Sequence, residues 1–126
     1  MSETVKYKAT IIETSRDLTA RERLFIKDTS TAFKLDSLEA DQELSFRPVD
    51  YAILNVESPK AEKPYNTYVV VDEDGNKYVT GSESFWKAFE EIWEEMYDEA
   101  EEYKIKVYKK ESKNYQGKMF ITCSIE

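Results

Sequence analysis

The alternation of apolar and polar positions predicts that much of the chain forms short strands. Between Val5 and Ile12, the apolar odd positions alternate with the polar residues Lys6, Lys8 and Thr10, the period-two pattern of a half-buried strand. Further extended segments are expected at Arg23–Lys27 and Ala32–Leu35, and a long one at Leu44–Val56. Pro48 lies near the beginning of the long segment and suits a sheet edge or a bulge.

A β-hairpin is predicted over residues 67–80. Two extended runs, Tyr68–Val71 and Lys77–Thr80, flank the dipeptide Asp74–Gly75. Asp-Gly favours tight hairpin turns, because both central residues of such a turn need positive φ. A calcium loop is a poorer interpretation of the same segment, since its glycine stands at the fourth position and an EF-hand loop needs it at the sixth.

One long amphipathic helix is predicted after Gly81, with Ser82 or Ser84 as its N-cap. Its apolar residues recur at steps of three and four, namely Phe85, Phe89, Ile92, Met96 and Ala100, flanked by Trp86, Trp93 and Tyr97. The other face is acidic and carries Glu90, Glu91, Glu94, Glu95, Asp98, Glu99 and Glu101. The aromatic stripe is interpreted as core rather than a cofactor site, because a helix on a sheet must bury such a stripe.

Two final strands are predicted at residues 103–110 and 118–125. Their odd positions are apolar, so one face of the pair is expected to be buried. Cys123 belongs to that face and is interpreted as a packed apolar residue rather than a reactive thiol. The even positions are basic and aromatic, and include Lys104, Lys106, Tyr108, Lys110, Lys118 and Phe120. The connecting loop adds Lys113 and Tyr115.

Composition excludes several chemistries. The 126 residues suit a single domain, and they contain no His and one Cys. Nucleophiles activated by His, His-ligated zinc and an internal disulfide are therefore excluded. The three glycines cannot form a Gly-rich phosphate loop, and no carboxylate pair stands out among 26 acidic residues. We expect no enzyme activity, no cofactor and no metal.

The chain has no segment that predicts membrane insertion or export. Its N-terminus lacks an apolar leader, and its longest apolar runs are far below the roughly 20 residues of a membrane helix. With a single cysteine as well, we expect a cytoplasmic protein without a membrane partner.

The net charge of −8 is unevenly distributed. Residues 82–102 contain nine acidic residues and one lysine, whereas residues 103–118 contain six lysines and one glutamate. An acidic excess argues at first against a nucleic-acid partner, because lysine and arginine neutralise phosphates in such complexes. Here the acidity is confined to the predicted helix and its tail, and the last hairpin is basic.

The last hairpin combines the two features of a site for single-stranded nucleic acid. Basic side chains hold the backbone, and bases stack on exposed aromatic rings, each stack contributing about 1–3 kcal/mol. A solvated sheet face with protective lysines explains the lysines but not the exposed rings of Tyr108 and Phe120. Four more residues are candidates for this surface, although the alternation of residues does not determine which way their side chains point: Phe33, Lys34, Tyr68 and Tyr78.

Several motifs occur in a suggestive order: Leu24–Phe25, Ser30–Leu35, Asp74–Gly75 with Tyr78 and Ser82, the amphipathic helix, Tyr103–Val107 and residues 113–120. In this combination, over about residues 24–125, the chain resembles the small single-stranded DNA-binding proteins of phages and mobile elements of Gram-positive bacteria. The resemblance implies one OB-fold-like domain over residues 1–126. Such a domain is a mainly β small barrel with an amphipathic helix between its third and fourth strands.

The resemblance also implies a function. The protein would coat single-stranded DNA without sequence preference during replication or recombination, in the cytoplasm of a bacterial host. Replication or recombination proteins are candidate partners through the acidic helix, and a homodimer is a candidate assembly. The alternative is an acidic inhibitor of a host nuclease or defence system, whose helix imitates a nucleic-acid backbone. The basic hairpin acts in the first case and the acidic helix in the second.

Overall fold

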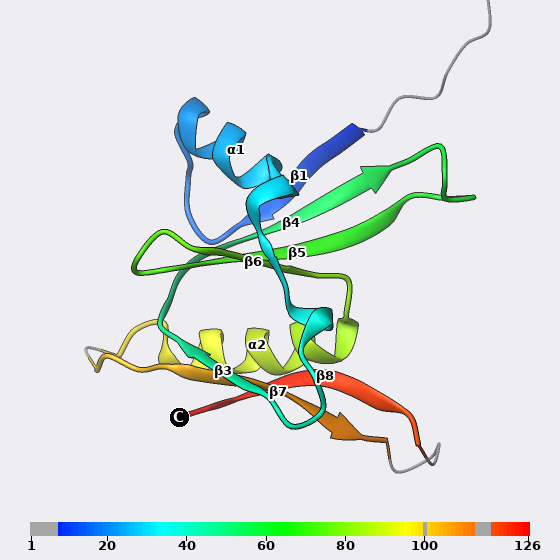
Figure 1. Ribbon diagram of the computed structural model, residues 1–126. Helices are drawn as coiled ribbons and strands as arrows, with labels where there is room; N and C mark the ends of the chain where they lie inside the picture. Colours follow the sequence, from blue (N-terminus) through cyan, green and yellow to red (C-terminus); the bar gives the residue numbers. More distant parts are fainter. Residues whose placement is uncertain (1–7, 100, 113–116) are drawn as a thin grey trace, which may run out of the picture.

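The computed structural model describes residues 8–99, 101–112 and 117–126. Within them the chain forms β1 (Lys8–Thr14), α1 (Ala20–Lys27), β2 (Phe33–Lys34), β3 (Glu43–Phe46), β4 (Pro48–Glu57), β5 (Tyr65–Asp72), β6 (Lys77–Thr80), α2 (Glu83–Met96), β7 (Ile105–Glu111) and β8 (Met119–Ile125) (Figure 1). The beginning of the first expected strand, Ala100 of the helix stripe, Lys113 and Tyr115 lie outside the described residues.

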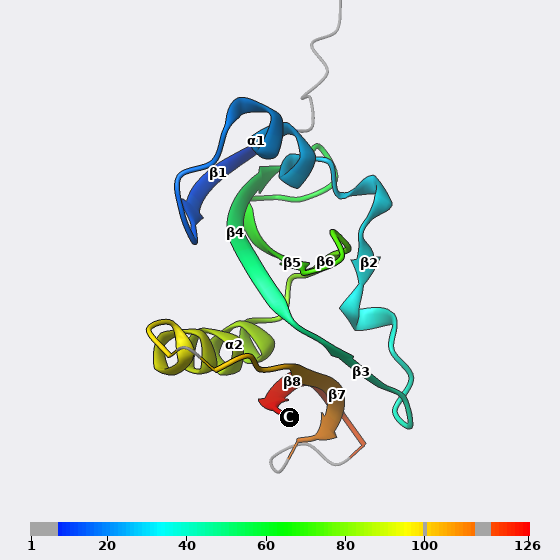
Figure 2. The same cartoon turned by 90° about the vertical axis from the view of Figure 1, so that its left-hand side faces the viewer.

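The strands form two sheets that share one continuous stretch of chain. Sheet A has the order β1-β4-β5-β6-β2, and sheet B has the order β3-β7-β8. Only Arg47 separates β3 from β4, and Figure 2 shows this ribbon curving from one sheet into the other. The long extended segment predicted over 44–56 is therefore confirmed. Pro48 lies at a register irregularity between β4 and β5, as its missing N–H requires.

Helix α2 lies between the two sheets and supplies much of the core. Ser82 caps it by accepting a hydrogen bond from the Phe85 N–H at 3.2 Å. Phe85, Trp86 and Phe89 are buried, and Ile92 and Trp93 pack against the same core, which confirms that part of the predicted stripe. Tyr97 follows the helix and is 66% exposed, so its place in the stripe was wrong. The same apolar cluster contains residues of both sheets, including Phe46, Tyr68, Val70, Ile105, Val107, Ile121 and Cys123.

Helix α1 replaces a predicted strand, so the extended structure expected at Arg23–Lys27 was wrong. Thr19 and Glu22 form a capping box, in which each side chain accepts a hydrogen bond from the other residue's backbone N–H. This local signal outweighs the brief apolar alternation that suggested a strand. The buried side chain of Ile26 packs on the outer face of sheet A, in a second cluster with Ala52, Leu54, Val56, Val69, Val71 and Val79.

The hairpin predicted over residues 67–80 is confirmed, but its turn differs from the expected one. Gly75 has φ +84°, and no other residue of the turn has positive φ. The loop has three residues between the paired backbones of Asp72 and Asn76, with glycine in the left-handed position. The Asp72 carboxylate closes the loop by accepting hydrogen bonds from the backbone N–H groups of Asp74 and Asn76, both at 2.9 Å.

The two sheets do not close into the barrel that was expected. Strand β6 pairs in parallel with β2, and within the described residues no pair of strands joins β6 to β8. The mainly β part of the prediction is confirmed, with two helices rather than one. No helix in this described part is long and apolar enough to cross a membrane.

Asp72 should be a major contributor to stability. Burial acts to raise its pKa, but hydrogen bonds from Asn76, the Tyr78 hydroxyl and Asp74 outweigh burial and hold the pKa below its usual value. Replacing Asp72 with Asn should lower the free energy of unfolding by about 1–3 kcal/mol, measured by urea denaturation at neutral pH.

Asp74→Asn is the matched control, because Asp74 offers the turn its backbone N–H rather than its carboxylate. The Asp72 contribution is complete above the unfolded pKa of about 4 and is lost as pH falls through the lower native pKa. The difference between Asp72→Asn and the parent protein should therefore shrink in acid. An equal loss of unfolding free energy in Asp72→Asn and Asp74→Asn would contradict this role.

Candidate nucleic-acid interface

The outer face of sheet B brings the predicted basic and aromatic residues together. Strand pairing places Lys110 opposite Phe120, and Tyr108 between Glu43 and Thr122. Ile105, Val107, Ile121 and Cys123 are buried on the inner face, so these partners point outward. Lys110 is exposed, and Tyr108 and Phe120 are half-buried, each with part of its ring facing solvent.

The basic residues are spread along the whole hairpin. Lys106 lies on the outer face, and Lys104 and Lys118 stand immediately before β7 and β8, at opposite ends of the antiparallel pair. Both Lys104 and Lys118 are exposed. A seven-residue strand is about 20 Å long, so these ammonium groups could follow several successive phosphates. The buried face predicted for the hairpin is confirmed at Ile105, Val107, Ile121 and Cys123, whereas Met119 and Ile125, at the two ends of β8, are 42% and 50% exposed.

A shallow groove runs beside Tyr108 on this face. Its lining residues are Ala40, Asp41, Gln42, Glu43, Lys106, Tyr108, Lys109 and Ser124. Lys106 forms an ion pair with Glu43 across the groove, with 3.2 Å between Nζ and Oε2. The carboxylates of Asp41 and Glu43 make this end of the face less basic than the end near Lys110.

Tyr68 and Tyr78 do not belong to an exposed surface, contrary to their candidate role. Tyr68 is only 7% exposed and stacks on Trp86 with ring centroids 4.8 Å apart. Tyr78 is 8% exposed, stacks on Phe46 at 4.0 Å, and donates its hydroxyl hydrogen to Asp72 at 2.8 Å. Both rings are core residues because their strand positions face α2 and sheet B.

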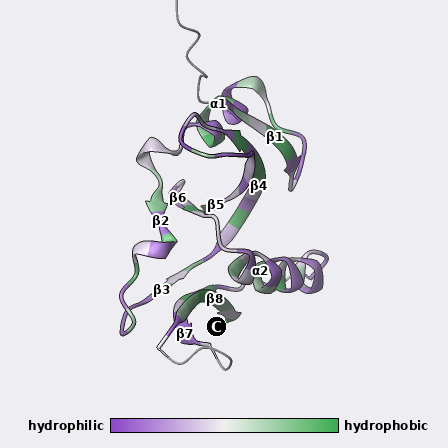
Figure 3. Ribbon diagram, turned by 90° about the vertical axis from the view of Figure 1, so that its right-hand side faces the viewer, coloured by the Kyte–Doolittle hydropathy of each residue, from purple (hydrophilic) through white to green (hydrophobic). Residues whose placement is uncertain are grey.

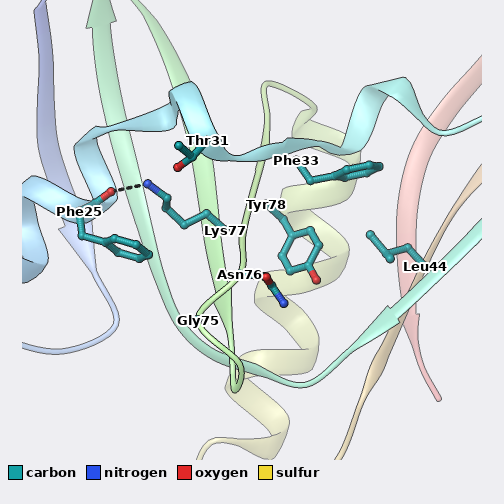
Figure 4. A pocket seen from close by; sticks show the side chains of 8 residues that line it. All are labelled: Phe25, Thr31, Phe33, Leu44, Gly75, Asn76, Lys77 and Tyr78. Atoms are coloured by element: carbon teal, nitrogen blue, oxygen red, sulfur yellow. Dashed lines mark hydrogen bonds between the residues drawn. The ribbon is translucent and has the colours of Figure 1, made fainter.

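Phe33 and Lys34 are exposed on β2, but they do not join the outer face of sheet B. Phe33 lines a separate pocket of about 530 Å³ (Figure 4) whose other lining residues are Phe25, Thr31, Leu44, Gly75, Asn76, Lys77 and Tyr78. Leu44 and Glu43 are neighbours on β3 and point to opposite faces. The pocket and the groove therefore lie on different sides of this strand.

Phe25 and Lys77 are residues of this pocket that sequence reasoning missed. The Lys77 side chain is buried, and its ammonium donates hydrogen bonds to the backbone carbonyls of Phe25, at 2.7 Å, and of Asp28. It also lies 4.2 Å from the centroid of the Phe25 ring. The capping box of α1 is the local signal that would have placed Phe25 on a helix.

The outer face of sheet A is covered and cannot bind a strand. Val69, Val71 and Val79 on β5 and β6 are buried under α1. Arg16 holds the beginning of α1 in place by pairing with Glu22 and with Asp50 of β4. Sheet B is thus the sheet whose outer face carries exposed lysines and accessible rings.

Acidic side chains line a different part of the molecule. Glu90, Glu91, Glu94 and Glu95 are all exposed on α2. Figure 3 shows hydrophilic residues along this helix, which lies on the inner side of sheet B. Within the described residues, no group of three or more carboxylates and thiols is arranged to hold a metal ion.

No protein-family model, curated protein or solved structure matches the chain. The assignment of this surface therefore rests on its own geometry and chemistry.

Cys123 should be unreactive in the folded protein. Burial raises the pKa of its thiol to about 12, and the side chain packs in the core beneath α2. An aromatic disulfide reagent should modify the native protein at least about a hundredfold more slowly than the urea-unfolded chain, measured by absorbance of the released thiolate. Similar rates in both states would contradict the packed position.

Proposed function

We propose that the protein binds single-stranded DNA without sequence preference through the outer face of sheet B. The observation that carries this proposal is the pairing of β7 and β8, which places Tyr108, Lys110 and Phe120 on one accessible face. Bases would stack on the two rings, while the lysines along the hairpin neutralise phosphates. Neither contact reads base edges, so the binding would be independent of sequence.

We also propose that the fold is an opened OB-type arrangement. One long strand, β3–β4, pairs with β5 at one end and with β7 at the other, β5 continues to β6, and β7 continues to β8. Helix α2 lies between β6 and β7, where the OB-fold has its helix. The difference is at β6, whose free edge pairs with β2 instead of with the last strand.

This arrangement explains why the proposed site lies on the final hairpin. OB-folds bind oligonucleotides on the face of their second and third strands, which correspond to β5 and β6. Here α1 covers that face. The basic aromatic face of β7 and β8 remains accessible, and it supports a displaced site. The resemblance to phage and mobile-element proteins supports a role in coating replication or recombination intermediates.

The exposed carboxylates of α2 favour a second candidate function, in which the protein inhibits a nucleic-acid-binding enzyme by imitating a nucleic-acid backbone. The two candidates use different surfaces. Loss of DNA binding on changing Tyr108 supports the first function. Loss of enzyme inhibition on changing Glu91 and Glu95 supports the second.

Tyr108→Ala should weaken binding of fluorescein-labelled oligo(dT) about fivefold to a hundredfold, because one stacked base is lost. Fluorescence anisotropy at low salt measures the affinity directly. Both tryptophans of the chain lie on α2, so their fluorescence is a poor reporter of this face. Lys110→Gln should make the slope of log affinity against log salt less negative by about 0.7, because one phosphate contact is lost.

Tyr97→Ala is the matched control, since Tyr97 is 66% exposed and follows α2 rather than lying on sheet B. It should leave affinity within about twofold. The proposal fails if the parent protein does not bind oligo(dT) at micromolar concentration and low salt. It also fails if Tyr97→Ala and Tyr108→Ala weaken binding equally.

A further inference from the structure

A small aromatic pocket lies between α2 and the edge of sheet A, away from the proposed DNA site. Its volume is about 150 Å³, and its lining residues are Glu13, Tyr51, Trp86, Glu90, Trp93 and Glu94. Three aromatic side chains and three carboxylates therefore face one cavity that is large enough for a single small head group.

The aromatic walls pack against one another and against the core. The ring centroid of Tyr51 lies 5.1 Å from that of Trp86 and 5.2 Å from that of Trp93, and both pairs are edge-to-face. Phe89 supports the walls from the core side through contacts with both tryptophans. Aromatic faces attract cations, and tryptophan does so most strongly.

Two of the carboxylates come from the same stripe of α2 as the tryptophans. Glu90 is four residues after Trp86 and three before Trp93, and Glu94 is four residues after Glu90, so the four side chains share one side of the helix. Both glutamates are exposed.

The third carboxylate reaches the pocket because of a β-bulge. Ile11 pairs with Leu54, and Glu13 pairs with Ile53, so Ile12 is an extra residue in β1. In a regular strand with no bulge, residues 11 and 13 would face the same way, and Glu13 would share the face of Ile11, which packs under α1. The bulge turns Glu13 toward α2, where its Oε2 accepts a hydrogen bond from the Tyr51 hydroxyl at 3.3 Å. Ile12 itself is left 55% exposed, so the bulge serves the position of Glu13 rather than the packing of Ile12.

The negative charge of the pocket has no cationic partner among the described residues. The ion pairs found among the described residues involve none of Glu13, Glu90 and Glu94. Burial first, and then the charges of these three carboxylates, raise the pKa of the Tyr51 hydroxyl. The three groups thus act together on one point in the cavity.

We propose that this pocket binds a lysine or arginine side chain from a basic segment of a partner protein. Trp86 is stacked between Tyr68 and Phe89, so the half-buried rings of Tyr51 and Trp93 would contact the cationic head group, and the carboxylates would neutralise it. A protein segment fits better than a free ion, because the exposed carboxylates of Glu91 and Glu95 extend the acidic surface beyond the pocket. Additional basic residues of the same segment would interact only weakly with Glu91 and Glu95, because these exposed carboxylates lie outside the pocket.

A peptide of alternating arginine and glycine tests the proposal, and the same peptide with neutral citrulline in place of arginine is its reference. The only two tryptophans of the chain line the pocket, so selective tryptophan excitation reports its occupancy. We expect the arginine peptide to change tryptophan emission saturably and the citrulline peptide to leave it unchanged. Equal responses to both peptides, or no response to either, would overturn the proposal.

The double variant Glu90→Gln, Glu94→Gln should weaken the arginine peptide at least about tenfold. Glu91→Gln, Glu95→Gln is the matched control, because it removes the same charge from the same helix outside the pocket. It should weaken binding by less than about threefold. Equal losses would mean that the peptide binds a diffuse acidic surface, which overturns the pocket.

Both double variants should fold, since Gln and Glu have similar helix propensities and all four positions are exposed. Circular dichroism verifies this. Oligo(dT) affinity should remain within about twofold of the parent value in both variants. The proposed peptide site and the proposed DNA site are therefore tested independently.

Discussion

The architecture depends on burial of the aromatic stripe of α2 between two sheets. Phe85 and Phe89 are almost completely inaccessible to solvent, and this single stripe covers the inner faces of both sheet A and sheet B. Once one face of β7 and β8 is committed to the helix, strand geometry sends the alternate residues outward. The basic aromatic surface is therefore a direct consequence of how the core is filled. The same burial leaves the glutamates of α2, beside and opposite the stripe, exposed to water.

Charge is separated by this arrangement rather than averaged over the surface. The strongly acidic helix and the basic hairpin are adjacent in sequence, yet sheet B turns its lysines away from α2. A negative strand approaching the molecule would be repelled from the helix side and attracted to the outer face of sheet B. A positively charged segment would be attracted to the helix side and repelled from the outer face of sheet B. A chain with a net charge of −8 can thus offer surfaces of both signs.

Local patterns predicted the elements whose signals are periodic. The parity of β7 and β8, the stripe of α2 and the Asp-Gly hairpin were all readable from residue spacing. The orientation of Tyr68 and Tyr78 was not, because both faces of the central strands are covered and Val69, Val70 and Val71 are all buried. The bulge at Ile12 was equally hidden, since it depends on pairing with β4. Pairing of β2 with β6 joins residues distant in sequence, so the division of the strands into two sheets could not be inferred from local pattern.

The buried ammonium of Lys77 has a consequence for cooperativity. Helix α1 has eight residues and is too short to persist alone in water. Lys77 donates to carbonyls at its C-terminal end from within β6, so detachment of the helix would strand a desolvated cation in the sheet. Fraying of α1 is thereby linked to disruption of the strand that carries Lys77. Helix α1 and the central strands of sheet A consequently behave as one folding unit.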